Sequence, residues 1–362
     1  MSASLATYFQ SSAHRRERAE LPILSELINR FRQQSPFAGQ TVVFGHILAR
    51  NSLVMIEALE AGGASLVLSD AHNAPAADQV RAELARLAIP VLPVADAVQQ
   101  GDLYLDVAAV LGRAKPPTAA AEVTRTGVLH YRSMGVPVVS ADDARSKLIE
   151  GFYGTGESFQ RAWQLLRPAD PLPGKQVVTF GFGKIGRGVA FRTRAAGMKV
   201  TVVEPNEEAR TRATNDGFVA LDPAASDMQA ALKAADIIIA VTGVAGAVGA
   251  SVPLDWLRYG AVLVNLGADD EYGPAIADDE VLGGKLPPLN FHLPQPTLNR
   301  YVDAPLSAHL LALEYLVQAG RSLPAGIHPL PEAMDRWVID RWRHHHPSED
   351  LTGIGAQLGL SS

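Results

Sequence analysis

Short apolar runs alternate along the chain with segments whose apolar residues recur at helical spacing. Such runs are typical of buried parallel strands, and the intervening segments are typical of amphipathic helices. In the first part of the chain the predicted strands are Thr41–Phe44, Ala64–Leu68, Val91–Val94 and Val136–Ser140, and the run Leu103–Leu111 around Asp106 continues the same alternation. The predicted helices are Leu21–Phe31, Asn51–Ala61, Ala77–Leu87 and one beginning at Asp143. This alternation predicts an open α/β domain.

A second series of strands follows a connecting helix at Ser158–Leu166 and a proline-rich segment at Arg167–Gly174. Its members are Val177–Phe180, Val200–Val203, Phe218–Leu221, Asp236–Val241, Ala261–Leu266 and a sixth apolar segment at Leu286–Phe291. The strongly apolar helix Pro305–Ala319 is expected to cross back to the first domain. We therefore predict an α/β fold in which a Rossmann-type doubly wound NAD-binding domain (156–300) is inserted between parts of a second α/β substrate domain (1–155, with C-terminal helices 301–362).

The turn after Val177–Phe180 has glycines at G-x-G-x-x-G spacing, followed by a helix and a second strand. This spacing gives a tight turn, a close approach of the backbone to a pyrophosphate, and close packing of helix on strand. The loop residues expected to hold the phosphates are Gly181, Phe182, Gly183, Lys184, Ile185 and Gly186.

Glu204 ends the second strand of this unit. An acid there holds the ribose 2′-hydroxyl of NAD, whereas a 2′-phosphate would meet a like charge, so NAD is favoured over NADP. Further along, Thr242, Gly243, Asn265 and Gly267 stand at strand ends that face a bound dinucleotide in this fold.

Composition excludes several classes of function. The 362 residues are 47% hydrophobic and 19% charged, with a net charge of −6, and no basic patch with interleaved aromatic residues indicates a nucleic-acid partner. No cysteine is present, which excludes disulfides, thiolate metal sites and a cysteine nucleophile.

The longest apolar segment, Ala234–Ala250, is interrupted by Thr242 and glycines, so no membrane span is predicted. Met1–Gln10 lacks the pattern of a secretory signal, and the cytoplasm is the expected compartment.

Polar residues at the strand ends of the first domain are positional candidates for ligand binding: His46, Asp70, His72, Asn73 and Asp106. A functional role for His46 and a loop histidine bonded to backbone are equally compatible with the sequence. For Asp70, His72 and Asn73 a turn with a helix N-cap is the preferred interpretation. The run His344–His346 is expected to be a solvated tail, because adjacent side chains on a helix do not converge on a metal. No metal site is predicted.

From Thr41 to Glu314 the order of motifs resembles the S-adenosylhomocysteine hydrolase family. GFGKIGRG is similar to that family's cofactor loop, VVEPNEEARTRATNDGF to its second strand, ADIIIAVTG to its fourth strand and NLGADDE to its fifth. Upstream, SLVMIEALEAGGASLVLSDAHN and SKLIEGFYGTGES are similar to its first helix and strand and to the entry of its connecting helix.

The resemblance implies a resident NAD that oxidises a ribose 3′-hydroxyl, which permits elimination of homocysteine, addition of water and return of the hydride. On the cofactor side it implies roles for Gly181, Gly183, Gly186, Glu204, Thr242, Asn265 and Asn290, with Thr124 and Thr126 in the threonine-rich segment that reaches the nicotinamide. It also implies a homo-oligomer, although the family's lysine-tyrosine C-terminal tail is missing.

The substrate side departs from the family pattern. Where the family has a lysine-x-lysine-x-aspartate-asparagine run, this chain has Arg145 at the first lysine, Lys147 at the second and Ile149 at the aspartate, unless a one-residue insertion lets Glu150 take the aspartate's place. Arginine is a poor general base and isoleucine cannot titrate.

The family's helix-entry histidine aligns with Ile47, one place beyond His46, and its glutamate before the threonine run aligns with Val123, next to Glu122. The histidine of the fifth-strand motif is Ala268, and of the family's aspartate pair only Asp106 remains.

The NAD-binding half of the chain retains the family's motifs, whereas the substrate half departs from them. Three hypotheses follow. The leading one is an NAD-dependent enzyme that oxidises, permanently or transiently, a hydroxyl of a small polar substrate in the interdomain cleft. Its candidate catalytic residues are Lys147, Arg145, His46, Asp106 and Glu150. Arg145 and Lys147 would alternatively bind a carboxylate or phosphate, and Arg145 and Glu150 would alternatively form a surface pair. The second hypothesis is S-adenosylhomocysteine hydrolysis with displaced catalytic residues, and the third is a catalytically inert NAD-binding regulatory protein.

Overall fold

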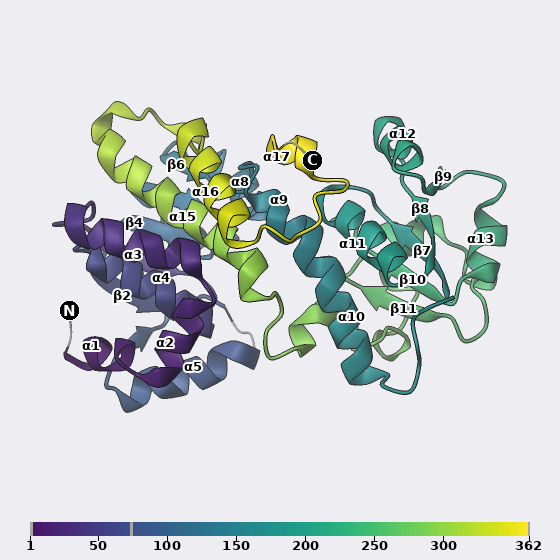
Figure 1. Ribbon diagram of the computed structural model, residues 1–362, viewed down its shortest axis with the longest axis horizontal. Helices are drawn as coiled ribbons and strands as arrows, with labels where there is room; N and C mark the ends of the chain where they lie inside the picture. The colour runs from purple at the N-terminus through teal and green to yellow at the C-terminus, as the bar shows by residue number, and fades with distance from the viewer. Residues whose placement is uncertain (1–2, 73–74, 361–362) are drawn as a thin grey trace. The chain divides into compact units, whose positions relative to one another are not determined.

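The computed structural model describes residues 3–72 and 75–360. Asn73, a candidate ligand-binding residue in the sequence, lies outside the described residues. The chain forms two compact units (Figure 1). Unit 1 contains Met1–Ile149, Asn299–Asp350 and Gln357–Gly359, and unit 2 contains Glu150–Leu298, Leu351–Ala356 and Leu360–Ser362. The main part of unit 2, Glu150–Leu298, is thus inserted into the chain of unit 1, as the sequence predicts. The segments Leu351–Ala356 and Leu360–Ser362 group with unit 2, whereas the sequence prediction assigned all of 301–362 to the first domain.

Unit 1 is built on a seven-stranded parallel sheet with strand order β12-β6-β5-β4-β1-β2-β3. The strands are β1 (Thr41–Gly45), β2 (Ser65–Ser69), β3 (Val91–Leu92), β4 (Leu103–Asp106), β5 (Ala119–Glu122), β6 (Pro137–Ser140) and β12 (Gly326–Pro329). The chain starts at β1, runs outward through β2 and β3, and then restarts at β4 on the other side of β1. This reversal creates a topological switch point between β1 and β4, which is where ligands bind in open α/β sheets.

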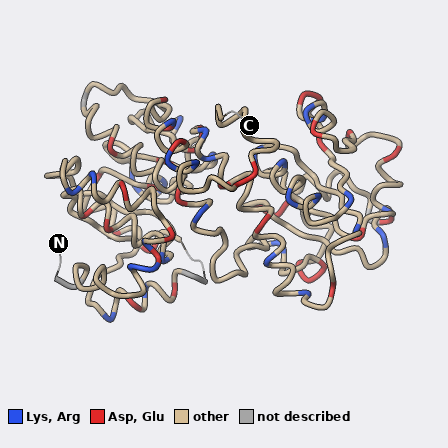
Figure 2. The backbone as a smooth tube through the Cα atoms, in the orientation of Figure 1, with Lys and Arg blue, Asp and Glu red and all other residues tan. Residues whose placement is uncertain are grey.

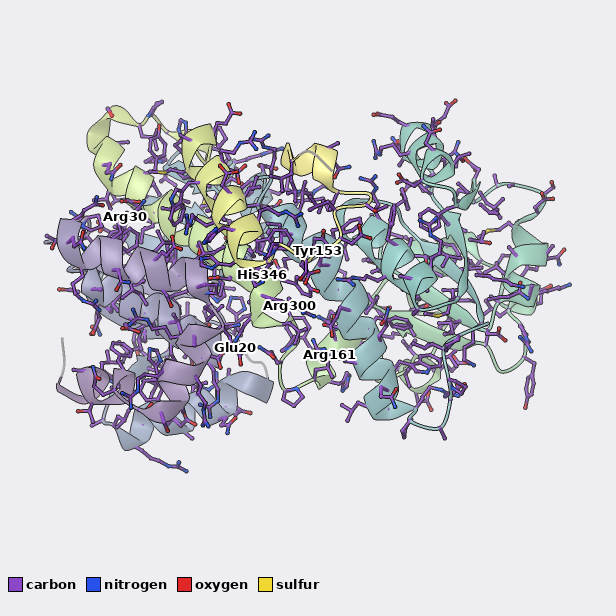
Figure 3. All side chains as sticks on the ribbon, in the orientation of Figure 1. Glu20, Arg30, Tyr153, Arg161, Arg300 and His346 are labelled. Carbon is purple, nitrogen blue, oxygen red and sulfur yellow. The ribbon has the colours of Figure 1, made fainter. Side chains whose placement is uncertain are left out.

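Helices cover both faces of this sheet. One face is covered by α3 (Pro22–Gln34), α4 (Arg50–Ala61) and α15 (Asn299–Ala319), with α2 (Ser12–Ala19) packed on α4 and α16 (Glu332–His345) on α15. Arg30 of α3, labelled in Figure 3, forms an ion pair with Glu314 of α15 and so links two helices of this layer. The opposite face is covered by α6 (Val94–Ala97), α7 (Val110–Ala114) and α8 (Arg125–Tyr131). The remaining helical segments of unit 1 are α1 (Ala3–Phe9), α5 (Pro75–Arg86), α9 (Lys147–Ile149) and a 3-10 turn at Gly320–Ser322.

Unit 2 is built on a five-stranded parallel sheet with strand order β11-β10-β7-β8-β9. Its strands are β7 (Gln176–Phe180), β8 (Lys199–Val203), β9 (Val219–Leu221), β10 (Ile237–Ala240) and β11 (Val262–Asn265). Its helical segments are η1 (Glu150–Gly154), α10 (Thr155–Leu166), α11 (Lys184–Ala195), α12 (Glu207–Asn215), α13 (Met228–Ala234), α14 (Ala247–Ser251), η2 (Leu254–Trp256), η3 (Asp278–Glu280) and η4 (Leu289–His292). A last short helix, α17 (Gly355–Leu358), is shared between the units.

The central strand β10 shows why the apolar runs of unit 2 are continuous. Ile237 and Ile239 pack in one cluster with Phe159 and Trp163 of α10, whereas Ile238 packs in a second cluster with residues of α13. All three isoleucines are fully buried. Because both faces of the strand are covered, every side chain is apolar, and the alternation expected of a half-exposed strand is absent.

The structure differs from the sequence prediction at several elements. Leu286–Phe291, predicted as a sixth apolar segment of the Rossmann series, contains the short 3-10 helix η4 and no strand. Val94 begins α6 and so lies outside β3, and the helix expected from Asp143 begins at Lys147. Strands β5 and β12 were not predicted. The expected solvated tail at His344–His346 is also wrong: α16 runs through His345, and His345 is 2.8 Å from Glu26 of α3.

Charged residues of both signs are interspersed along both units (Figure 2). In the part of the chain that the structure describes, no helix combines the length and apolar character needed to cross a bilayer. Residues 3–72 and 75–360 also contain no group of three or more histidine or acidic side chains arranged to hold a metal ion.

Candidate functional site

The glycine loop of unit 2 is built for close backbone approach. Gly181 has a φ of +99°, and a Cβ there would lie 2.6 Å from the carbonyl oxygen of Val241. A Cβ on Gly186 would lie 2.2 Å from the carbonyl oxygen of Gly181, so the start of α11 packs directly on the loop. At Gly183 a Cβ would meet no atom of the described residues within 4 Å. Gly181 and Gly186 are therefore required by packing, whereas Gly183 opens onto free space in front of the helix N-terminus, where a pyrophosphate would lie.

Glu204, at the carboxyl end of β8, is held beside this loop. Its carboxylate accepts the backbone N–H of Phe182 at 2.8 Å and that of Asn206 at 2.9 Å. The guanidinium of Arg210 donates to the backbone carbonyl oxygens of Glu204 and Pro205 and pairs with Asp222. The carboxylate is therefore fixed at the position where an acid binds the ribose of a dinucleotide.

Glu271 organises the loop after β10. Its buried carboxylate accepts the N–H and the hydroxyl of Thr242 and the N–H of Gly243, at 2.7, 2.9 and 2.7 Å. Burial raises the pKa of Glu271, and the hydrogen bonds from Thr242 and Gly243 oppose that rise. A Cβ on Gly267 would lie 1.9 Å from the same carboxylate. Glu271, a residue that the sequence analysis did not select, thus shapes the loops that carry Thr242, Gly243 and Gly267.

Asn265 ties the end of β11 to the following loops. Its side-chain amide donates to the carbonyl oxygens of Gly267, Asp269 and Lys285, and its side-chain oxygen accepts the N–H of Gly267 at 3.2 Å. Asn290 lies on η4 and is buried. Lys184 and Ile185 begin α11 next to the glycine loop, with Ile185 40% exposed. Together the loop geometry, the placed acid and the ordered strand ends fit a dinucleotide.

The switch point of unit 1 holds a group of histidines. His46 directly follows β1, and its Nδ1 lies 3.3 Å from the carbonyl oxygen of Ile47. His309 of α15 is fully buried, with its Nε2 3.0 Å from the carbonyl oxygen of Ala121 on β5. The centroids of the His46 and His309 rings are 5.9 Å apart. His72 lies beyond β2, with Nε2 3.2 Å from the carbonyl oxygen of Val107.

These histidines are neutral at physiological pH. Burial lowers the pKa of His46 to about 4, and the neighbouring His72 and Lys147 lower it further against the opposing hydrogen bond to Ile47. Burial likewise lowers the pKa of His309 to about 3, with His46 and Lys147 contributing in the same direction. The pKa of His72 is lowered by burial. Lys147 is thus an electrostatic neighbour of both His46 and His309.

The segment that carries Lys147 is fixed by Asp335 of α16. The Asp335 carboxylate accepts the backbone N–H of Arg145 at 2.9 Å and that of Ser146 at 3.0 Å. The guanidinium of Arg145 lies 3.4 Å from Glu332 and 3.7 Å from Asp335. These contacts favour a structural role for Arg145. The alternative from the sequence was a surface pair of Arg145 with Glu150, whereas in the structure Arg145 pairs with Glu332 and Asp335.

The carboxylates of Asp106 and Glu122 accept hydrogen bonds from backbone N–H groups of the neighbouring loops. Asp106 is fully buried and accepts the N–H groups of Val107, Leu111 and Gly112 and the hydroxyl of Tyr131. Glu122 accepts the N–H groups of Ala108, Ala109, Val123 and Thr124 and the hydroxyl of Thr124. Burial, followed by the charge of Asp106, raises the pKa of Glu122 to about 7.

This bonding supports a structural role for Asp106. Glu122 fixes Thr124 at the start of α8, and Thr126 is exposed on the first turn of that helix.

Comparison with known proteins shows which enzymes the chain is similar to. Residues 151–273 match the family model described as the NAD-binding domain of S-adenosyl-L-homocysteine hydrolase. An S-inosyl-L-homocysteine hydrolase from Methanopyrus kandleri is 26% identical, with 89% of this chain and 87% of that protein covered. An adenosylhomocysteinase from Nostoc sp. is 29% identical, with 88% of this chain and 86% of that protein covered. Over most of its length the chain is thus similar to S-adenosylhomocysteine hydrolases, and residues 151–273 match that family's NAD-binding domain.

NAD is accordingly the cofactor of unit 2, as predicted from the glycine loop and Glu204. Among solved structures, a dipicolinate synthase from Bacillus halodurans matches with a TM-score of 0.45 and 15% sequence identity, covering 74% of this chain and 96% of that chain.

The segment aligned with the family's lysine-x-lysine-x-aspartate-asparagine run ends in a π-helix that begins at Glu150. Glu150–Gly154 forms a π-helix between α9 and α10. A π-helical turn accommodates one extra residue in a helix, and such turns occur frequently at functional sites. Ile149, which takes the family aspartate's place in an alignment without insertion, is fully buried, whereas Glu150 is half-buried. This backbone favours the alignment in which an inserted residue shifts Glu150 into the aspartate's place.

The structure brings together two predicted candidates, His46 and Lys147, with His309, which the sequence analysis did not select. In the sequence, His309 is surrounded by the apolar residues of α15. The carbonyl group that it contacts belongs to Ala121, 188 residues away in the sequence. Helix α15 has the apolar pattern of a buried core helix, so no local signal in the sequence identifies His309 as a site residue.

Proposed function

We propose that this chain is an NAD-dependent enzyme that oxidises, permanently or transiently, a hydroxyl group of a small polar substrate held by unit 1. The observation that carries the proposal is a neutral imidazole, His46, at the switch point of unit 1, with Lys147 as its electrostatic neighbour. NAD, when bound to unit 2, supplies the hydride acceptor. Unit 1 then has to bind the hydroxyl and take up its proton.

In this proposal His46 is the proton acceptor. Its Nδ1 faces the carbonyl oxygen of Ile47, so Nδ1 carries the proton and Nε2 has the free lone pair. An imidazole with a pKa of about 4 is almost entirely unprotonated at neutral pH, so its Nε2 lone pair is free to accept the hydroxyl proton, although as a weaker base than an exposed histidine. Lys147 has the complementary task of stabilising negative charge that develops on the substrate oxygen.

The test is the absorbance of the reduced-nicotinamide band in protein loaded with NAD. Candidate substrates are S-adenosylhomocysteine, S-inosylhomocysteine, adenosine, hydroxy acids and sugar phosphates. We expect at least one of them to reduce the bound cofactor, and the His46→Gln variant to lose about 10²-fold or more of that rate. His328→Gln is the matched control, because His328 also bonds a backbone carbonyl, that of Pro324, but lies on the edge strand β12.

A second candidate function is hydrolysis of a homocysteine thioether, which the π-helix at Glu150–Gly154 favours. In this case Glu150 takes the part of the family's aspartate, and the oxidation is transient. Hydrolysis of S-adenosyl- or S-inosylhomocysteine releases a free thiol. Since the chain contains no cysteine, a thiol reagent detects that product without background from the protein.

The two functions are distinguished by what accumulates. Thiol release with no net cofactor reduction supports the hydrolase, and its loss in Glu150→Gln assigns the residue. Reduced cofactor without thiol release supports a repurposed oxidoreductase. Tight NAD binding with neither signal for any compound overturns both and supports an inert NAD-binding protein.

A further inference from the structure

Glu271 carries a buried carboxylate in the loop after β11 of unit 2. Its Oε2 accepts the N–H and the hydroxyl of Thr242, at 2.7 and 2.9 Å, and its Oε1 accepts the N–H of Gly243 at 2.7 Å. Backbone N–H groups can only donate hydrogen bonds. Because two of the three partners are of this kind, the arrangement favours the ionised carboxylate over the protonated acid.

In the part of the chain that the structure describes, no lysine, arginine or histidine forms an ion pair with Glu271. Burial raises the pKa of Glu271, and the like charge of Asp269 adds to that rise against the hydrogen bonds from Thr242 and Gly243. A buried charge without a counter-charge is costly. A ligand that brings a positive charge near Glu271 would offset that cost.

The strand order of unit 2 assigns Glu271 to one half of a bound dinucleotide. The glycine loop follows the central strand β7, and Glu204 follows β8 on one side of that strand. A dinucleotide crosses the carboxyl ends of such a sheet with its pyrophosphate at the glycine loop. Because Glu204 is the acid expected at the adenosine ribose, the nicotinamide half belongs to the other side, at the ends of β10 and β11, where the loops held by Glu271 lie.

Gly243, one of the donors to this carboxylate, is itself exposed. It has a φ of +72°, and a Cβ on it would meet no atom of the described residues within 4 Å. A ligand group can therefore rest on this loop without displacing a side chain of the described residues. Since the carboxylate is buried, water screens its charge only weakly from such a group.

We propose that Glu271 sets the preference of unit 2 between the two redox forms of its cofactor: its negative charge favours NAD⁺, whose nicotinamide ring is positive, over NADH, whose ring is neutral. Uptake of a hydride converts NAD⁺ into NADH. A preference for NAD⁺ therefore makes hydride uptake less favourable, and return of the hydride more favourable, by the same factor. The inference concerns cofactor binding to unit 2 and holds whether or not unit 1 binds an oxidisable substrate.

The test compares three compounds on the full-length protein: NAD⁺, NADH and ADP-ribose, which lacks the nicotinamide. The protein is loaded with NADH, and its fluorescence reports displacement by NAD⁺ or by ADP-ribose. Glu271→Gln keeps the shape of the side chain and removes its charge. It should weaken the competition of NAD⁺ against NADH by about 10-fold or more, because a weakly screened attraction is lost, and change that of ADP-ribose less than about 2-fold.

Asp269→Asn is the matched control, because it removes an exposed negative charge from the same loop. Water screens that charge, so both competitions should stay as in wild type. Thr242→Val removes one hydrogen bond to Glu271 but retains its charge, and should therefore retain the wild-type ratio of NAD⁺ to NADH affinity. These two variants separate the charge of Glu271 from its role in shaping the loop.

An unchanged ratio of NAD⁺ to NADH affinity in Glu271→Gln overturns the proposal, and so does an equal weakening of NAD⁺ and ADP-ribose, which would show that Glu271 only shapes the loop. If Glu271→Gln does not fold, the wild type decides: tighter binding of NADH than of NAD⁺ overturns the proposal, and tighter binding of NAD⁺ supports it. No substrate takes part in these measurements, so their outcome is independent of the proposed function.

Discussion

The carboxylate of Glu204 accepts the backbone N–H of Phe182, in the middle of the glycine loop, at 2.8 Å. This contact connects the strand end predicted to bind the ribose to the loop predicted to hold the phosphates. Replacing Glu204 with alanine should weaken NAD binding by about 1.5–3 kcal/mol, because a charged hydrogen-bonding group is lost. Isothermal titration of NAD and NADP measures the effect.

The matched variant Glu204→Gln retains a side-chain oxygen but loses the charge. It should recover part of the NAD affinity and reduce the discrimination against NADP, since the like charge facing a 2′-phosphate is gone. Equal NAD affinity in wild type and Glu204→Ala would contradict the assignment of the ribose-binding acid.

Gly183 and Gly186 should respond differently to alanine. Gly183 has backbone angles that alanine adopts (φ −75°, ψ −160°), and a Cβ there meets free space. Gly183→Ala should therefore leave the free energy of unfolding without NAD within about 0.5 kcal/mol of wild type, yet abolish the stabilisation that NAD provides. Gly186→Ala should destabilise the protein even without NAD, because its Cβ would lie 2.2 Å from the carbonyl oxygen of Gly181. Denaturant unfolding with and without NAD checks both, and a stable Gly186→Ala variant would contradict the close packing of helix on loop.

Asp303 should make the stability of unit 1 fall as the pH rises. Its buried carboxylate accepts the N–H groups of Ile23 and Leu24 at the start of α3, and burial raises its pKa to about 7. Since the folded-state pKa exceeds that of the unfolded chain, its contribution is fully present below about pH 4 and is lost as the pH rises through 7. The cost of ionisation is of order 2–4 kcal/mol.

Asp303→Asn removes this titration. Relative to wild type, the variant should gain stability between pH 5 and pH 8, because its amide stays neutral while the wild-type carboxyl ionises. Urea unfolding at the two pH values measures the difference. A difference between variant and wild type that does not change with pH would show that Asp303 does not titrate in this range.

Lys147 and Arg145 are close in sequence but should differ in function. Lys147→Met should lower cofactor reduction by about 10²-fold or more, because the charge next to His46 and His309 is lost. Arg145→Met should change that rate little and lower stability by no more than about 1 kcal/mol, since its half-exposed guanidinium pairs with Glu332 and Asp335. Single-turnover reduction of bound NAD measures both variants. A large rate loss in Arg145→Met with normal stability would return Arg145 to the catalytic group.

The sequence predicts the cofactor half well because its signals are local. The glycines, the two flanking strands and Glu204 lie within one βαβ unit, so each is interpreted in the context of its neighbours. Strand β5 was missed because Ala119–Glu122 is rich in alanine, which favours helix over strand. Strand β12 was missed because it is short and joins β6 from far along the chain.

The substrate half depends on contacts between residues distant in sequence. The partners of Arg145 lie on α16, nearly two hundred residues later, and His309 bonds a carbonyl 188 residues earlier. Neither pairing has a periodic or motif signal. The π-helix at Glu150 was considered only as an insertion in an alignment, since its conformation depends on packing that the local sequence does not encode.

A hydroxyl compound bound to unit 1 should pass a hydride to the NAD of unit 2. Rapid mixing of the NAD-loaded protein with S-inosylhomocysteine, adenosine and sugar phosphates, followed at the reduced-nicotinamide band, tests it most directly. At least one compound should give a single-exponential rise, which is lost in His46→Gln and retained in His328→Gln. Bound NAD that no hydroxyl compound reduces, or a rise that survives in His46→Gln, would contradict it.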